Sequence, residues 1–364
     1  MKQQIIDLWK ISFGDTDDFI RLYFDRVYKD EQTLVIRKND RVVSALQILP
    51  YQMTYCGTTI PVGYIYGVCT LPSERGKGLM KKLMLQALEE MRLRGYALSM
   101  LIPATPQLFD VYRRFEFANA FDYAIEDMQA KKPSNNTNSY SRSFPNEQII
   151  VDCPLLVRKQ RGVTYHFPVI ARNEAIRLDQ LLPDTLYSYY HKKQLERDCC
   201  ILHSATQFEI ICQDRQLGGG EIWVAISDEQ LVGLAFTDPF TNDTLSIREI
   251  MCNDIEINNK LVQSILNHHQ LNRAKLRIPP TPSHSIPYGM ARIINKAQMV
   301  DLHVQSSRFK VQGSSSPPVP LSDRDGERIQ NSKLPDNIYA DIPLLTQKLL
   351  HYDQRRAYMN LMLD

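Results

Sequence analysis

The sequence predicts an α+β fold divided into three domains. Its 364 residues exceed the roughly 250 to 300 residues at which a single hydrophobic core stops growing. Two segments rich in Pro, Ser and Asn, at 131–148 and 278–289, are typical of linkers. We therefore expect domains at residues 1–135, 148–280 and 288–364. In the first domain, β-rich runs precede a glycine loop, an amphipathic helix and a further apolar run, which favours a mixed sheet with helices.

The first domain is expected to open with a helix and an antiparallel meander. The helix lies within residues 15–28, is capped by Asp15 or Thr16, and places apolar side chains on one face: Phe19, Leu22, Tyr23 and Val27. Residues 33–70 form β-rich runs that are broken at Asn39-Asp40 and Cys56-Gly57, as hairpin turns would break them. Three or four strands fit this segment.

A helix and a buried strand complete the predicted core of the first domain. Apolar residues recur at helical spacing until Gly95 ends the helix: Leu79, Met80, Leu83, Met84, Ala87, Leu88 and Met91. Residues 96–102 then read as a buried strand. We expect it to run parallel to the strand before the helix, because a helix that joins two neighbouring strands makes them parallel.

The second domain shows a faint repeat of the first, and the third combines strands and a helix. Residues 224–235 match residues 35–46 as strand, acidic turn and strand, at a spacing of 189 residues. The second copy has no glycine where the first has its loop. In the third domain we expect strands at 290–294 and 308–312, followed by a helical stretch that contains Leu344, Leu345, Leu349 and Leu350.

Composition excludes several classes of protein. With 43 Lys and Arg against 41 Asp and Glu, the chain lacks the one-sided charge that nucleic-acid binding requires. The seven cysteines include no Cys-x-x-Cys pair, and His268-His269 has no third ligand in view, so we expect no metal site. Because no segment has the length and apolarity of a signal peptide or membrane span, we expect a cytoplasmic protein with reduced thiols.

The most informative segment is VCTLPSERGKGLMKKLM, at residues 68–84. A strand, a glycine turn and a helix together form an anion cradle, because the first amides of the helix are unpaired and the helix dipole adds positive charge. Gly76 and Gly78 lack Cβ atoms, and Arg75 and Lys77 add charge. The spacing fits neither a P-loop nor a dinucleotide-binding turn. The sequence therefore predicts a phosphate-bearing ligand.

Val68, Pro72, Arg75 and Gly78 resemble the acetyl-CoA loop of the GNAT superfamily of N-acetyltransferases. Met80 stands where Gly or Ala is usual, and a large apolar residue there resembles the enhanced intracellular survival (Eis-like) branch. The resemblance implies acetyl-CoA as co-substrate, with the pantetheine arm along Val68, Cys69 and Thr70. It places the pyrophosphate in the loop formed by Arg75, Gly76, Lys77, Gly78, Leu79 and Met80.

The resemblance also implies a general acid. Residues 111–117, VYRRFEF, resemble the Ile/Val-Tyr-x-x-Phe-Gly-Tyr/Phe segment of the same branch, in which the tyrosine protonates the departing thiolate. Tyr112 aligns with that tyrosine, and Glu116 replaces the glycine. A tyrosine stays protonated at neutral pH because its ordinary pKa is about 10. The alternative is a packing role for Tyr112, in an aromatic cluster with Phe115 and Phe117.

In the same branch the C-terminal carboxylate enters the active site of the first domain. This chain ends in RRAYMNLMLD, whose apolar side chains can be buried while Asp364 presents its terminal carboxylate to the attacking amine. The alternative is a frayed terminus, which is the commoner arrangement. A covalent route through Cys69 is less favoured, since side chains alternate along a strand and that of Cys69 points away from those of Val68 and Thr70.

The resemblance completes the expected architecture and function. It implies a GNAT domain with the acetyl-CoA loop, a degenerate GNAT-like domain and a C-terminal domain like sterol carrier protein type 2. Residues 288–300 resemble the opening of that last domain. It also implies a trimer or hexamer. We expect acetyl transfer to a primary amine by direct attack in a ternary complex, the amine belonging to a polyamine, an aminoglycoside-like molecule or lysine. The alternative is a non-catalytic CoA-sensing or lipid-binding module.

Overall fold

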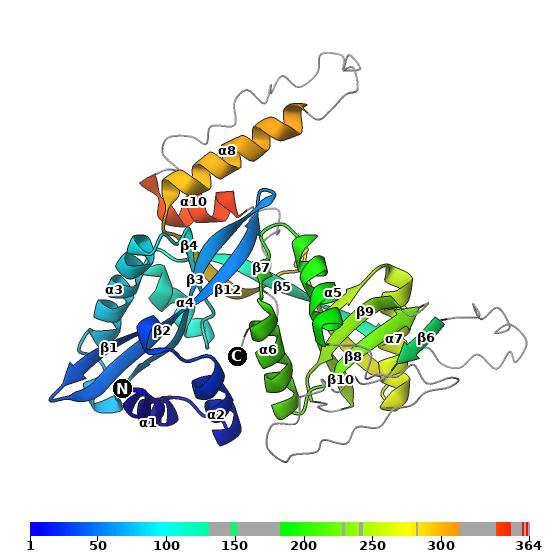
Figure 1. The fold of residues 1–364 in the computed structure, drawn as a ribbon, viewed down its shortest axis with the longest axis horizontal. Coiled ribbons are helices and arrows are strands. Elements are labelled where there is room, and N and C mark those ends of the chain that lie inside the picture. The colour runs from blue at the N-terminus through cyan, green and yellow to red at the C-terminus, as the bar shows by residue number, and fades with distance from the viewer. Residues whose placement is uncertain are drawn as a thin grey trace, which may run out of the picture.

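The fold is organised around one mixed 12-stranded sheet (Figure 1). The computed structural model describes residues 1–130, 147–150, 183–227, 230–239, 243–281, 283–312, 340–350, 359 and 362. Strands follow the order β1-β2-β3-β4-β12-β5-β11-β10-β9-β8-β6, and β7 pairs with β2. Within the described ranges, every helix is too short or too polar to span a bilayer.

The first half of the molecule, residues 1–130, supplies five of the twelve strands and four helices. The elements are α1 (Lys2–Ser12), α2 (Asp17–Arg26), β1 (Thr33–Lys38), β2 (Arg41–Tyr55), β3 (Thr58–Thr70), α3 (Leu79–Leu93), β4 (Leu98–Leu101), α4 (Pro106–Arg113) and β5 (Ala118–Gln129). Helices α1 and α2 pack on one face of β2 and β3, and α3 packs on the other, each through its own cluster of buried apolar side chains.

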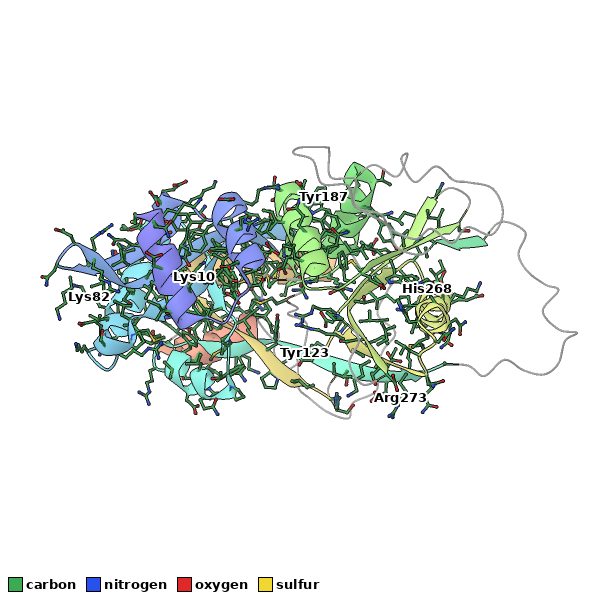
Figure 2. All side chains as sticks on the ribbon, turned by 90° about the horizontal axis from the view of Figure 1, so that it is seen from below. Lys10, Lys82, Tyr123, Tyr187, His268 and Arg273 are labelled. Atoms are coloured by element: carbon green, nitrogen blue, oxygen red, sulfur yellow. The ribbon has the colours of Figure 1, made fainter. Side chains whose placement is uncertain are left out.

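The second half of the molecule, from β6 to β11, supplies six more strands, and β12 is the twelfth. Its elements are β6 (Glu147–Ile150), α5 (Pro183–Leu195), β7 (Ile201–Leu202), α6 (Ala205–Leu217), β8 (Ile222–Ser227), β9 (Gln230–Thr237), β10 (Thr244–Cys252), α7 (Ile255–His268) and β11 (Arg273–Ile278). They are followed by β12 (Ile286–Ile293), α8 (Lys296–Gln312) and α10 (Ile342–Leu349). In Figure 2 the label of Tyr123, on β5, lies between those of Lys10 and Lys82 in the first half and that of His268 in the second.

Local signals in the first half produce the predicted elements. Thr16 caps α2 by accepting a hydrogen bond from the Phe19 amide at 3.3 Å. Both hairpin turns use left-handed backbone, with φ of 48° at Asn39 and 50° at Cys56. The meander has three strands, and β4 runs parallel to β3 as expected. Helix α3 buries the predicted face and is followed by Gly95 at φ 76°.

The second half repeats the order of the first. The first residues of β1 and β8, Thr33 and Ile222, are 189 residues apart, as are those of β2 and β9, Arg41 and Gln230. Strand β10 then leads through α7 to β11, which pairs with it in parallel. The predicted internal repeat is therefore present as strand, hairpin, helix and parallel strand.

Strand β12 is the main departure from a simple succession of domains. It comes from the expected third domain, yet it lies between β4 and β5 and pairs antiparallel with both. The expected boundary at residue 288 falls inside this strand. Strand β5 joins the halves, because its first residues pair with β12 and its last residues, Ala124 to Gln129, pair with β11.

The last part of the chain departs from prediction in one further place. Residues 308–312, expected as a strand, belong to α8. A five-residue run has too little periodicity to separate strand from helix, and a helix that has begun at Lys296 propagates at low cost. The predicted C-terminal helix is α10, and it buries Leu345 and Leu349. The likeness of this part to a sterol carrier protein domain stays a prediction.

Candidate active site

The candidate site lies where two parallel strands separate. Strands β3 and β4 are paired from Val62 opposite Leu98 to Tyr64 opposite Met100. Strand β4 ends at Leu101, whereas β3 continues to Thr70. Beyond Tyr64, this edge of β3 has no strand partner in the described part of the chain. An extended ligand can hydrogen-bond to such an edge as an added strand does.

A bulge shapes the unpaired segment of β3. Ala45 of β2 lies opposite Cys69 and Gln47 opposite Tyr66, so β3 holds one extra residue between these pairs. Gly67 sits in the bulge with a φ of 59°. A Cβ atom on Gly67 would lie 2.2 Å from Oε1 of Gln47 and 2.4 Å from Cζ3 of Trp9. Only glycine therefore fits this position without rearrangement.

The glycine loop connects this strand to α3. Gly76 and Gly78 both have φ of 76°, and Gly78 caps α3 without any side-chain hydrogen bond. The first amide of the helix to find a helical acceptor is that of Lys82, which donates to the Gly78 carbonyl at 3.1 Å. The preceding amides, including those of Leu79 and Met80, lie at the positive end of the helix dipole. This geometry fits a pyrophosphate.

The two basic residues of the loop have different positions. Arg75 donates through Nε to the Thr70 carbonyl at 3.1 Å, which ties the loop to the end of β3. Lys77 pairs with the Glu74 carboxylate at 3.0 Å. Hydrogen bonds from Lys77 and Lys38 lower the pKa of Glu74. Both basic side chains are exposed at the loop, where they can approach an anion.

The second half lacks this cradle. Its corresponding helix, α7, is capped by Asp254, whose carboxylate accepts a hydrogen bond from the Ile257 amide at 2.8 Å. The carboxylate thus occupies the helix start and adds negative charge there. The repeat therefore keeps the strands and the helix but not a cradle for an anion.

Tyr112 lies beside the predicted ligand segments. Its ring belongs to the buried cluster that covers the α3 face of the sheet, against which Val68 and Met80 also pack. Burial raises the pKa of Tyr112 to about 12. Its ring centroid is 6.3 Å from that of Phe117, so the packing role expected as the alternative is also present. One residue each from β3, the start of α3 and α4 thus belongs to the same apolar cluster.

Glu116 explains how the segment after Tyr112 tolerates the loss of glycine. It adopts a left-handed conformation with a φ of 62°, which favours the glycine found in the resembling branch. Its carboxylate pairs with Arg292 of β12 at 2.6 Å. The turn is therefore retained, and the Glu116 side chain binds β12, a strand from much later in the chain.

Cys69 belongs to the opposite face. Its side chain lies in the cluster beneath α1 and α2, apart from Val68 and Tyr112. Burial raises the pKa of its thiol to about 12. A thiol in that state is a poor nucleophile at neutral pH. The prediction that Cys69 points away from Val68 is confirmed. The hydroxyl groups of Thr70 and Ser44 are hydrogen-bonded, with 2.7 Å between the oxygens.

Two residues of the C-terminal tail are described, and both are buried. The Met359 carbonyl accepts a hydrogen bond from Nη2 of Arg277 at 3.2 Å. Arg277 lies over two aromatic rings, 4.4 Å from the centroid of Tyr123 and 3.9 Å from that of Tyr288. Met362 belongs to the same cluster of buried apolar side chains as Cys69. The tail is therefore packed at this point of the sheet, while Asp364 lies outside the described residues.

Sequence reasoning missed the residues on the α1 side of the bulge. Trp9 stacks on Tyr23 with 4.9 Å between ring centroids and lies 5.6 Å from Tyr66. Gln47 is fully buried, and neither of its amide atoms has a hydrogen-bond partner in the described part of the chain. The available signal was Gly67 itself, because a glycine inside a strand often marks a bulge.

No group of three His, Cys, Asp or Glu residues that could hold a metal ion occurs among the described residues. The pair at 268–269, considered as possible ligands, instead packs on Trp223. Nε2 of His269 lies 2.8 Å from the Glu221 carboxylate.

Comparisons with known proteins agree with this geometry. Residues 2–120 match the family model described as an acetyltransferase (GNAT) domain. A search of curated protein sequences gave no match. The match includes β3, the glycine loop, α3 and Tyr112. The first third of the chain is therefore an acetyltransferase domain of the GNAT type.

Solved structures extend the likeness over most of the fold. A GCN5-related N-acetyltransferase from Anabaena variabilis aligns with a TM-score of 0.57 and 15% identity, covering 82% of this chain and 72% of that one. A probable N-acyltransferase from Enterococcus faecalis gives 0.56 and 15%, covering 80% and 70%. Eis1 from Mycobacterium abscessus gives 0.57 and 11%, covering 83% and 72%. At these identities the alignments establish a shared fold.

Proposed function

This chain is an N-acetyltransferase, and we propose that it transfers the acetyl group of acetyl-CoA directly to a primary amine in a ternary complex. The observation that carries the proposal is the separation of β3 from β4 directly before the bulge and the glycine loop. A thioester with a long polar arm and a pyrophosphate needs an open strand edge followed by an anion cradle. Both features lie on one continuous segment, from Ile65 to Met80.

GNAT domains use acetyl-CoA, and the residues present fit it. The open edge at Val68, Cys69 and Thr70 supplies backbone groups for the pantetheine arm. The loop Arg75–Met80 supplies amides and positive charge for the pyrophosphate. When bound, acetyl-CoA supplies a thioester carbonyl that the amine attacks.

Tyr112 is proposed as the general acid. The amine nitrogen forms a bond to the acetyl carbon, the carbon–sulfur bond breaks, and the electron pair stays on sulfur. The Tyr112 hydroxyl donates a hydrogen bond to that sulfur as charge develops and supplies its proton. The amine loses one proton as it is acetylated and Tyr112 later regains one, so the overall reaction neither gains nor loses a proton. With its pKa raised to about 12, Tyr112 is protonated throughout the neutral range.

The terminal carboxylate of Asp364 is proposed to orient or deprotonate the amine. The support is that Met359 and Met362, a few residues before it, are buried, and that Met359 lies against Gly289 of β12. A primary amine such as that of lysine has a pKa of about 10.4 and must lose a proton before it attacks. The class of amine, whether polyamine, aminoglycoside-like molecule or lysine, and a trimeric or hexameric assembly are part of the same proposal.

Replacement of Tyr112 by Phe tests the assignment of the acid. We expect kcat to fall about 100-fold, because general acid catalysis contributes that much, while the KM for acetyl-CoA changes little. Tyr96→Phe is the matched control, since it removes a hydroxyl from a ring packed against the same cluster. Unchanged turnover in Tyr112→Phe, with CoA release followed by a thiol reagent, would remove Tyr112 from the mechanism. A non-catalytic module has no observation in its favour.

A further inference from the structure

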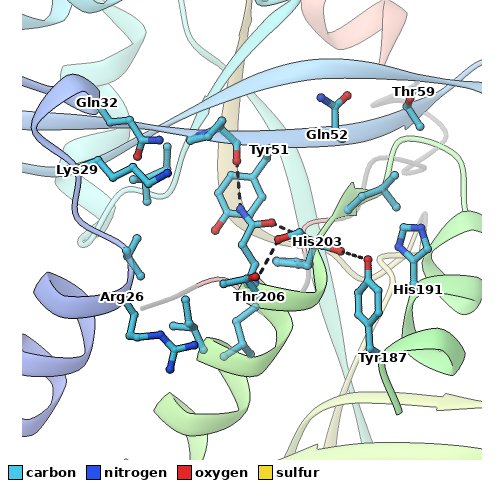
Figure 3. A pocket seen from close by; sticks show the side chains of 18 of the residues that line it. Arg26, Lys29, Gln32, Tyr51, Gln52, Thr59, Tyr187, His191, His203 and Thr206 are labelled. Carbon is cyan, nitrogen blue, oxygen red and sulfur yellow. Dashed lines mark hydrogen bonds between the residues drawn. The ribbon is translucent and has the colours of Figure 1, made fainter. Parts of the chain in front are cut away.

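A cavity lies where the two halves of the molecule meet, away from the candidate active site. Its volume is about 630 Å³, within the range of small-molecule sites. Figure 3 shows that its walls come from the end of α2, the edge of β2, helix α5 and the start of α6. No described residue of its lining belongs to the glycine loop or the Tyr112 cluster.

The cavity exists because β2 has a gap along its outer edge. Strand β1 pairs with β2 as far as Gln47, and β7 pairs with it from Gln52. Between these points the strand edge faces the cavity. Gln207 of α6 reaches across and donates to the Pro50 carbonyl at 3.1 Å. The two halves thus enclose the space without closing the sheet over it.

The polar lining is basic. Arg26 is the last residue of α2, Lys29 follows it in the loop, and His191 comes from α5 (Figure 3). The described lining residues include neither Asp nor Glu. Arg26 is already paired with Glu209 at 3.2 Å. Lys29 has no carboxylate at ion-pair distance among the described residues. Lys29 is exposed, so its ammonium group can pair with an anion bound in the cavity.

The start of helix α6 also favours an anion. Helix α6 starts at the cavity, and Ser204 and Gln207 cap each other there through a reciprocal pair of hydrogen bonds. The remaining amides of the first turn, including that of Thr206, add the positive end of the helix dipole.

The rest of the lining is apolar. It includes Val27, Leu49, Leu195, Leu202, Ile210 and Ile211. A ligand that satisfies both kinds of surface carries an anionic group and an aliphatic body. We propose that this cavity binds a small aliphatic carboxylate, with the carboxylate toward Lys29 and the start of α6. The inference rests on the cavity alone and is independent of the proposed function.

Isothermal titration of the full chain with octanoate tests this proposal. We expect saturable binding at one site, which persists in saturating CoA, and no binding of octylamine, which has the same chain length and the opposite charge. Lys29→Gln should weaken octanoate binding about tenfold, the effect of losing a charged hydrogen bond. Lys275→Gln, an exposed lysine on β11, is the matched control and should leave binding unchanged.

The proposal is overturned if octanoate shows no saturable binding, if CoA competes with it, if octylamine binds equally, or if Lys29→Gln binds octanoate like the unaltered chain.

Discussion

At the scale of single residues, the candidate site depends on a glycine that no motif includes. Gly67 lets β3 bulge beside Trp9 and Gln47, and the bulge sets which face Val68 and Cys69 present. Val68 joins the cluster around Tyr112, whereas Cys69 is buried on the other face. The bulge at Gly67 thus places Val68, which is expected along the ligand, and Cys69, whose thiol is not proposed to react, on opposite faces of the sheet.

Replacement of Gly67 by Ala should therefore destabilise the fold. The new Cβ would meet Gln47 and Trp9 at under 3 Å, and the positive φ adds strain, so we expect a loss of about 2–4 kcal/mol. Gly57→Ala is the control, because Gly57 also has a positive φ but open space around it; it should cost about 1 kcal/mol. Urea denaturation measures both. Equal losses in the two variants would contradict the role of the bulge.

At the scale of elements, the start of α3 distinguishes the two halves of the molecule. Both halves place a helix between parallel strands, but α3 begins at Gly78 with open amides and α7 begins at Asp254 with a carboxylate on its first turn. The same scaffold therefore offers an anion site in one half and not in the other.

Gly78→Asp should give α3 a carboxylate at its first turn, as Asp254 does for α7. An added carboxylate opposes the pyrophosphate, so we expect the KM for acetyl-CoA to rise about tenfold or more while the protein stays folded. Gly78→Asn is the control, since Asn has the same shape, tolerates left-handed backbone and carries no charge. Steady-state kinetics separate the two. If both variants raise KM equally, the effect is steric and the electrostatic account fails.

The elements also show what sequence patterns can and cannot predict. Helix α3 and the hairpin at Asn39 were predictable because apolar periodicity and turn residues act within a few positions. The insertion of β12 between β4 and β5 was not predictable. Its partners lie far away in the chain, and the sequence of a short strand does not specify which strands pair with it. For the same reason the roles of Trp9 and Gln47 could not be predicted, because they depend on contacts with Gly67.

At the scale of the whole molecule, the first domain does not complete its own sheet. Strand β12, from near residue 290, fills the space between β4 and β5, and β5 continues into the second half. Arg292 of β12 also pairs with Glu116. The candidate active site is therefore supported by residues that lie far apart in the sequence.

A fragment of residues 1–130 should accordingly not fold by itself. Without β12, strands β4 and β5 lose their shared partner, and Met290 leaves the cluster around Tyr112. We expect the fragment to lack the near-ultraviolet circular dichroism of the full chain and to bind no acetyl-CoA. A fragment with a native-like spectrum and acetyl-CoA binding would show that β12 is dispensable.

The central claim is that acetyl-CoA binds along β3 and the glycine loop of the first half. Hydrogen exchange with and without acetyl-CoA tests it most directly, because backbone amides are the proposed contacts. We predict that acetyl-CoA protects amides in residues 65–82 and leaves residues 252–258, the equivalent segment of the second half, unchanged. Protection of 252–258, or no protection of 65–82 at saturating acetyl-CoA, would contradict the account.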